Sequence, residues 1–166
     1  MYVTADHAIE ADSAEGITRE LADRQEVIDA LLRFALGRDL RDRDLLLSAF
    51  TEDATFDFRP AAKKCGLEIP LIEPREMIAA VVLDPNVPLD TTHTVSNARV
   101  TFDGDTASLT ALVEAQHLPA ADHSRHAMLK NIYAVDLVRD GRRWVIRQMT
   151  VDNIWFTGDP NVIIGQ

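Results

Sequence analysis

The fold is decided by residues 91–118, TTHTVSNARVTFDGDTASLTALVEAQHL, and by residues 126–155, HAMLKNIYAVDLVRDGRRWVIRQMTVDNIW. In each stretch an aspartate-glycine pair separates two runs in which apolar and polar residues alternate, which is typical of a β-hairpin. Two hairpins in succession, with no helical pattern between them, predict a long antiparallel meander in the second half of the chain.

Upstream of the meander the sequence has a helical period. Ile28, Leu32 and Ala35 fall on one stripe, and apolar neighbours widen it into a surface that can face a core. This pattern predicts a helix from residue 18 to about residue 37 or 38. Asp42 can accept the free amides of a following first turn, so we expect it to cap a second helix that extends through Phe50.

The segment between these helices and the meander is mixed. Residues 54–58, ATFDF, alternate as a short strand, whereas residues 59–73 have neither period and predict an irregular flap or rim. Pro74 favours the first turn of another helix, over residues 74–83. Helices followed by a meander predict an α+β fold, a cone-shaped curved antiparallel sheet with the N-terminal helices packed on its concave face. A small ligand would bind between sheet and helices.

Length and charge narrow the classes of function. The chain has 166 residues, enough for one domain, which we expect over residues 17–158 between a flexible leader (1–16) and a C-terminal tail (159–166). Its 27 acidic and 17 basic side chains give a net charge of -10, which disfavours nucleic acid and anionic membranes as partners. The lone Cys65 and an acidic N-terminus without an apolar core predict a cytoplasmic protein.

Asp39 is the first candidate for chemistry. It lies eleven residues after Ile28 and seven after Leu32, so it continues the apolar stripe if the helix extends that far. In the alternative reading, Asp39 is a helix-end residue of the polar corner GRDLRDRD, hydrogen-bonded to nearby amides.

Two strand histidines are the next candidates. His93 shares a strand face with Val95 and Asn97, although a single histidine on a strand is more often structural. His117 ends a face of small and apolar residues that we expect to point into the cone, and the alternative places it at an exposed strand end beside Pro119.

Other chemistries have weaker support. His123 and His126 lie in a predicted hairpin loop, where their spacing does not suit a metal. Asp39, His93 and His117 could together offer two imidazoles and a carboxylate to a metal such as iron, but no tight ligand motif is present and we predict no metal. The sequence also has no glycine-rich phosphate loop and no serine-nucleophile elbow.

The order of these motifs resembles the SnoaL-like branch of the nuclear transport factor 2 superfamily over roughly residues 18–158. The specific parts are DLRDRDLLLSAFTEDATFDF (39–58), TTHTVSN (91–97) and DGDTASLTALVEAQH (103–117). Within that superfamily the chain resembles scytalone dehydratase and hexachlorocyclohexane dehydrochlorinase, which use an Asp-His pair to abstract a proton without a metal or an organic cofactor.

The resemblance implies roles for individual residues. Asp39 matches the aspartate of the pair, His93 matches its histidine, and His117 matches a second histidine found in the dehydratase. Asn131 lies close to a substrate-contacting asparagine of the dehydratase and is predicted, with Phe58, to bind the substrate. Tyr133 and Trp155 are predicted with them from their place on the late strands, where the alternative for an aromatic residue is core or subunit contact. The chain departs from the dehydratase at Arg38 and near Phe58, where that enzyme has tyrosines, and scytalone itself is therefore not the expected substrate.

These implications predict a cofactor-free acid–base lyase or isomerase of the dehydration or elimination type, acting on a small cyclic, mostly apolar substrate. In this hypothesis Asp39 orients His93, His93 takes a proton, and His117 or a water that it holds protonates the leaving group or the developing oxyanion. The alternatives are a non-catalytic ligand-binding module and the small subunit of a ring-hydroxylating dioxygenase. The family also implies a homo-oligomer, a dimer or trimer.

Overall fold

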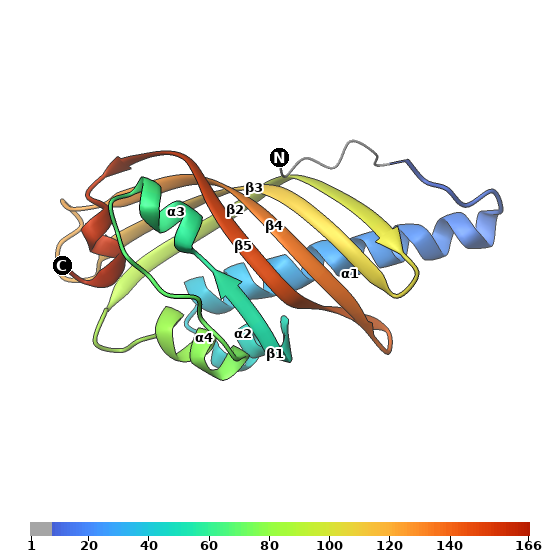
Figure 1. Cartoon of the computed structure of the whole chain (residues 1–166), viewed down its shortest axis with the longest axis horizontal. Coiled ribbons are helices and arrows are strands. Elements are labelled where there is room, and N and C mark those ends of the chain that lie inside the picture. Colours follow the sequence, from blue (N-terminus) through green and yellow to red (C-terminus); the bar gives the residue numbers. More distant parts are fainter. Residues whose placement is uncertain (1–7) are drawn as a thin grey trace.

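A computed structural model of the chain describes residues 8–166 (Figure 1). The helices are α1 (Ala14–Asp39), α2 (Arg43–Leu47), α3 (Arg59–Lys64), α4 (Arg75–Val82) and the 3-10 helix η1 (Pro160–Ile164). The strands are β1 (Phe50–Asp57), β2 (Leu89–Asp103), β3 (Thr106–Pro119), β4 (Ala127–Asp140) and β5 (Arg143–Gly158). Within the described residues these strands form one sheet in the order β1-β5-β4-β3-β2.

The two predicted hairpins form the body of the sheet. β2 pairs with β3 and β4 pairs with β5, and β3 also pairs with β4; all three pairings are antiparallel. Gly104 and Gly141 occupy the turns with φ of 59° and 61°, a left-handed conformation that glycine adopts without steric cost. β1 joins the edge in parallel to β5, so the sheet is mixed. The predicted α+β class, with helices on the concave face, is confirmed.

Helix α1 is the main element that covers the sheet, and Figure 1 shows it lying across the strands. It begins at Ala14, four residues earlier than predicted, because the Ser13 side chain accepts a hydrogen bond from the Gly16 amide and caps it. Val27, Leu31 and Phe34 on its inner face are at most 2% exposed. Burying each such side chain stabilises the fold by about 1.5–3 kcal/mol.

A tight corner between α1 and α2 places the end of α1. A Cβ added at Gly37 would lie 2.6 Å from the Leu46 amide nitrogen, so only glycine lets the two helices approach this closely. Asp42 accepts a hydrogen bond from the Leu45 amide at 2.9 Å, which confirms the predicted cap, although α2 ends at Leu47. The corner directs Asp39, the last residue of α1, towards the beginning of β2.

Residues 59–73 differ from the predicted irregular flap. Their first part is helix α3, and Phe56 and Ile72 then exchange two backbone hydrogen bonds, at 2.9 and 3.1 Å. A helix of six residues is too short to display a helical period, which is why the sequence pattern missed it. The segment therefore lies against the edge strand instead of forming an unstructured rim.

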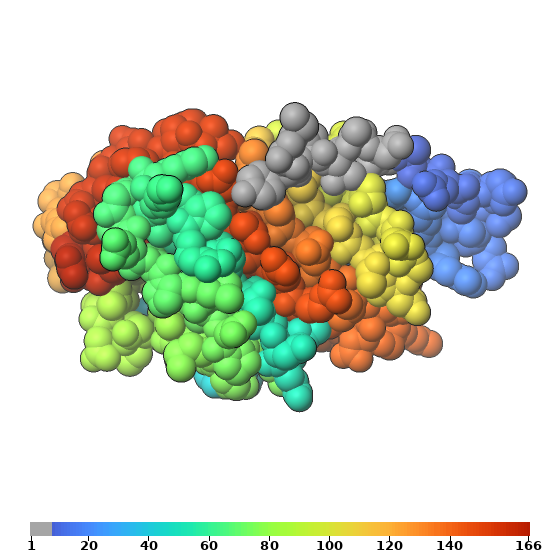
Figure 2. Space-filling view, in the orientation of Figure 1, coloured from blue at the N-terminus to red at the C-terminus, as the bar shows by residue number. Residues whose placement is uncertain are grey.

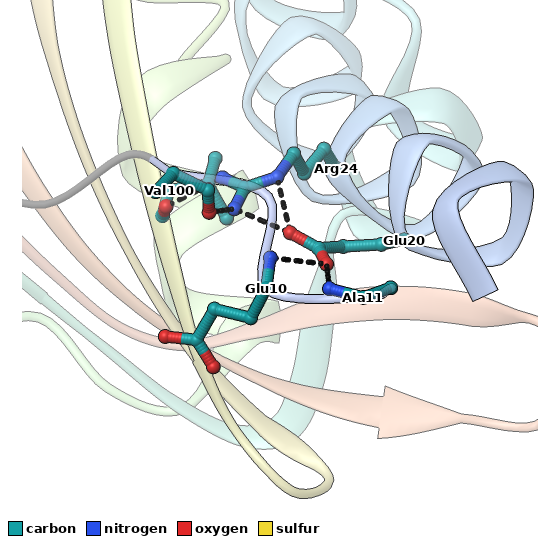
Figure 3. Close-up of polar contacts among 6 residues, drawn as sticks. Glu10, Ala11, Glu20, Arg24 and Val100 are labelled. Atoms are coloured by element: carbon teal, nitrogen blue, oxygen red, sulfur yellow. Dashed lines mark hydrogen bonds and ion pairs between the residues drawn. The ribbon is translucent and has the colours of Figure 1, made fainter. Parts of the chain in front are cut away.

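The described part of the N-terminal segment is tied to α1 and β2 (Figure 3). Glu20 accepts from the amides of Glu10 and Ala11, and Arg24 donates to the carbonyl of Val100 at 2.7 Å.

Figure 2 shows the first turns of α1 projecting at the end of the molecule opposite the C-terminus. Between residues 8 and 166, none of the helices has the length and apolar character needed to cross a membrane.

Candidate active site

A cavity of about 110 Å³ lies between α1, the concave face of the sheet and the segment around α3 and α4. Most of its wall is apolar, and the residues that form this part include Phe34, Phe56, Phe58, Ile69, Ile72 and Leu129. The polar side chains that reach the cavity are those of Arg38, His93, His117, Asn131 and Tyr133. A mostly apolar cavity with a few converging polar groups is the usual form of a small-molecule site.

Asp39 and His93 are in direct contact at the edge of this cavity. His93 Nδ1 lies 2.6 Å from Asp39 Oδ1, and the His93 backbone amide donates to Asp39 Oδ2 at 2.7 Å. Thr91 Oγ1 donates to Oδ1 at 2.8 Å. Both carboxylate oxygens are therefore occupied, and the His93 side chain is only 3% exposed.

The local structure explains why these groups meet. Thr91 and His93 are two residues apart on β2, so their side chains point to the same face of the strand, towards the end of α1. Thr91 was not among the residues singled out from the sequence, and its place two residues before His93 is the signal that could have identified it.

The electrostatics of the pair favour an ionised carboxylate. Burial opposes ionisation of Asp39, but the hydrogen bonds from His93 and Thr91 outweigh it and hold the pKa of this carboxyl below its usual value. An ionised carboxylate only accepts hydrogen bonds, so Nδ1 of His93 carries the proton in the neutral imidazole. The other ring nitrogen, Nε2, is then the basic one, and His93 lines the cavity.

His117 lies beside this pair. His117 lies on β3 two residues after Ala115, which is the residue paired with His93. The imidazole rings of His93 and His117 meet edge-on, with their centroids 5.6 Å apart. His117 is 6% exposed, so the reading in which it points into the cone is the one that the structure shows. Its Nδ1 is sealed from solvent, and the ring interacts with the backbone of Ala127 on β4.

Burial, reinforced by the nearby His93 and Arg38, lowers the pKa of His117 well below its usual value. His117 is therefore neutral at physiological pH. A neutral imidazole can donate a hydrogen bond to a developing oxyanion without a full positive charge, and triosephosphate isomerase uses a neutral histidine in this way.

The depressed pKa of His117 predicts acid sensitivity. The unfolded chain takes up a proton near pH 6.5 whereas the folded protein does not, so stability falls as the pH drops below about 6.5 towards the folded pKa. The slope from this one group approaches about 1.4 kcal/mol per pH unit. The free energy of unfolding, measured with denaturant, should fall less between pH 7.5 and pH 5.5 in His117→Gln than in the wild type. His123→Gln, which removes an exposed histidine, should keep the wild-type loss, and equal losses in all three proteins would refute this assignment.

β4 contributes two further polar groups, both of them predicted substrate-binding residues. Asn131 is 1% exposed and accepts a hydrogen bond from Asn153 Nδ2 at 2.9 Å, which fixes the orientation of its amide. Tyr133 is also buried, and burial raises the pKa of its phenol, so the hydroxyl stays protonated. Phe58, predicted with them, lies on the cavity wall, as does Phe34, which the sequence did not single out.

Trp155 differs from its predicted position, because the structure places it outside the cavity and leaves it 48% exposed. The register of β4 and β5 shifts between Lys130 and Asn131, so that Asn131 pairs with Asn153 and Lys130 pairs with Trp155. The extra residue, Ile154, reverses the alternation of β5 at this point. Asn153 therefore points inward, whereas Trp155 stands on the outer face beside Lys130.

The donors considered for a metal do not form a ligand cluster. No group of three or more histidine, cysteine or acidic side chains in residues 8–166 is arranged to hold a metal ion. His123 lies away from the cavity, 2.7 Å from the carboxylate of Asp90, and both side chains are more than half exposed.

The C-terminal tail closes one side of the cavity. Ile163 and Ile164 of η1 belong to its wall. In Figure 1 this helix lies at the same end of the molecule as α3. The C-terminal tail predicted over residues 159–166 therefore packs over the cavity.

Arg38 is the polar cavity residue that sequence reasoning left out of the site. Burial lowers the pKa of its guanidinium to about 10, so it remains a cation at neutral pH. Its position could have been found from spacing, since Leu31, Phe34, Ala35 and Arg38 continue one helical stripe. Its charge and its place in a polar corner instead indicated a surface residue.

Comparison with known proteins connects this geometry to a family. The model of the SnoaL-like domain matches residues 19–150. A curated relative, terrestric acid biosynthesis cluster protein E of Penicillium crustosum, is 28% identical over 150 residues, which cover 86% of this chain and 90% of the relative.

Solved structures share the fold. A provisionally named aromatic ring hydroxylase of Novosphingobium aromaticivorans has a TM-score of 0.73 at 24% identity, covering 86% of this chain and 97% of its own. A provisionally named scytalone dehydratase of the same species has a TM-score of 0.72 at 15% identity, and the match covers 85% of this chain and 90% of that one. A hexachlorocyclohexane dehydrochlorinase of Novosphingobium barchaimii has a TM-score of 0.72 at 18% identity, and the match covers 86% of this chain and 94% of that one. These likenesses establish the fold, and the domain match covers most of the chain, which therefore belongs to the SnoaL-like family.

Proposed function

We propose that the protein is an acid–base lyase or isomerase that acts on a small cyclic, mostly apolar compound. The observation that carries this proposal is the 2.6 Å contact between Asp39 and His93 Nδ1 beside an apolar cavity. A carboxylate on one ring nitrogen fixes the tautomer and stabilises the imidazolium that forms when the other nitrogen takes a proton.

The proposed chemistry begins with removal of a proton from a carbon next to a carbonyl group. His93 Nε2 takes the proton, and the electron pair of the broken C–H bond moves to the carbonyl oxygen to give an enolate. In elimination this pair returns to form a C=C bond while the leaving group departs from the next carbon, and the proton on His93 passes to that group. In isomerisation the proton returns to a different carbon. A positioned base contributes about 10²- to 10⁴-fold to such a rate.

The other polar groups of the cavity suit the developing charge. Neutral His117 and the protonated hydroxyl of Tyr133 can each donate a hydrogen bond to an enolate oxygen in a mostly apolar cavity. Asn131, whose carbonyl oxygen accepts from Asn153, donates to the Tyr133 hydroxyl oxygen and so leaves the hydrogen of that hydroxyl for the ligand.

The relative from Penicillium supports a small-molecule substrate, because its name assigns it to a biosynthetic cluster. The cytoplasmic location and the oligomeric state stay predictions. Ile154, Trp155 and Phe156, exposed at the end of β5, are the apolar surface on which we expect a second subunit to pack.

The test is deuterium incorporation. Small cyclic ketones and β-hydroxy ketones are incubated with the protein in D₂O containing a chelator, and the carbon next to the carbonyl is followed by NMR. We expect exchange or loss of water that is faster than in buffer and unchanged by the chelator. Activity that chelation abolishes would indicate a metal-dependent reaction. Ligands that bind without any exchange or elimination would favour a non-catalytic binding module.

A further inference from the structure

The Arg38 guanidinium lines the cavity without a protein partner. It makes no hydrogen bond or ion pair with any residue from 8 to 166. Arg33, five residues earlier on α1, shows the usual arrangement of a buried arginine, because it donates to the Asp29 carboxylate at 2.8 Å and to the Trp144 carbonyl at 2.7 Å. Arg38 is half-buried, and a cation that lines a mostly apolar cavity beside the proposed base without a protein partner points to an anionic ligand that completes it.

The groups nearest to Arg38 do not supply this partner. The carboxylate of Asp39, the next residue, attracts Arg38 only at long range, because it is not within ion-pair distance of the guanidinium and accepts its hydrogen bonds from Thr91 and His93. The Tyr133 phenol is neutral, and Arg41 carries the same charge as Arg38 and donates to the Leu83 carbonyl at 3.0 Å. The rest of the cavity wall near it is apolar.

We infer that Arg38 binds a carboxylate of the substrate, so that the natural substrate is a small cyclic carboxylic acid. This inference rests on the proposed function, because the carboxylate would anchor the ring and present its acidic C–H bond to His93. The planar guanidinium matches a carboxylate with two parallel hydrogen bonds. One cation balances one negative charge, whereas a dianionic phosphate would remain half-compensated in an apolar cavity.

The size of the cavity agrees with a single ring. Its volume is about 110 Å³. An engineered cavity of about 150 Å³ in another protein binds benzene, so this smaller cavity has room for no more than a single ring, whose carboxylate would extend to the half-buried Arg38. Benzoate and benzamide are therefore suitable probes, because they have the same ring and nearly the same shape but only benzoate carries a charge.

The experiment measures the affinities of benzoate and benzamide at pH 7.5 by isothermal titration calorimetry. Hydrogen bonds to charged groups contribute about 1.5–3 kcal/mol, which corresponds to a preference for benzoate of about 10- to 150-fold. We expect this preference in the wild type, its loss in Arg38→Gln and a smaller preference in Arg38→Lys. Arg142→Gln is the matched control, because it removes the same charge from an exposed turn and should keep the wild-type preference.

Two results would overturn the inference. One is a wild type that binds benzamide as tightly as benzoate, or binds neither, and the other is a preference that survives in Arg38→Gln. Thermal unfolding of Arg38→Met provides a second readout. Because the variant removes a half-buried cation that has no protein partner, its Tm should stay within a few degrees of that of the wild type. A loss of more than a few degrees would show that Arg38 is held by the fold and would count against a binding role.

The two proposals fail in different ways. The preference for benzoate should persist in His93→Gln, since binding to Arg38 does not require proton transfer. Persistent preference without any deuterium exchange would leave the carboxylate site intact and reject the lyase or isomerase. Exchange of neutral ketones together with no preference for benzoate would keep the enzyme and reject the role of Arg38.

Discussion

Replacing His93 by glutamine should lower the rate of deuterium incorporation by about 10²- to 10⁴-fold, the range that a positioned general base contributes. Glutamine can still fill the space next to Asp39, but its amide is not a base at neutral pH. The effect should appear in kcat and only weakly in KM, because the ring of the substrate is held mainly by the apolar wall of the cavity. NMR under chelating conditions measures it directly.

The matched control for this variant is His123→Gln. His123 also has a carboxylate partner, Asp90, at 2.7 Å, but both side chains are more than half exposed and lie away from the cavity. We expect this variant to keep the wild-type rate. Equal rates in His93→Gln and the wild type would mean that His93 is not the base.

Replacing Asp39 by asparagine should lower the same rate by at least about 10²-fold, because the residue positions the base. The asparagine side chain can turn its NH₂ group towards Nδ1 of His93, which removes the acceptor that keeps the proton there. His93 would then carry its proton on Nε2 and would present a donor to the substrate where a base is needed. A loss in kcat with a changed pH profile and an unchanged Tm distinguishes this positioning role from a structural one.

Two comparisons make the Asp39 result specific. Asp90→Asn removes the carboxylate from the exposed pair with His123 and should leave the rate unchanged. The double variant Asp39→Asn/His93→Gln should be no slower than His93→Gln alone, because the two residues act as one unit. Additive losses would show that Asp39 and His93 work independently.

Much of the fold could be predicted from local chemistry. The glycines of the two hairpin turns and the carboxylate of Asp42 act through neighbouring backbone, so a single sequence carries these signals. The alternation along β3 predicted that His117 points inward, and its side chain is buried in the structure. The Asp39–His93 contact joins residues 54 positions apart, and only the resemblance to a family, not spacing, brought them together.

The remaining features depend on tertiary context. β1 pairs in parallel with β5, and no local signal identifies the partner of an edge strand. The shift of register at Asn131 that turned Trp155 outward has no marker such as glycine in the sequence. Arg38 was missed because a charged residue at a helix end normally faces solvent, and its partial burial follows from the elements that enclose the cavity.

The most direct test of the Asp39–His93 pair is the tautomer of His93, measured by NMR on protein with ¹⁵N-labelled histidines at pH 7.5. The proposed arrangement predicts a neutral ring with its proton on Nδ1 and an unprotonated Nε2, and it predicts that Asp39→Asn changes this pattern. A proton on Nε2 in the wild type, or a spectrum that Asp39→Asn leaves unchanged, would contradict a base held by Asp39.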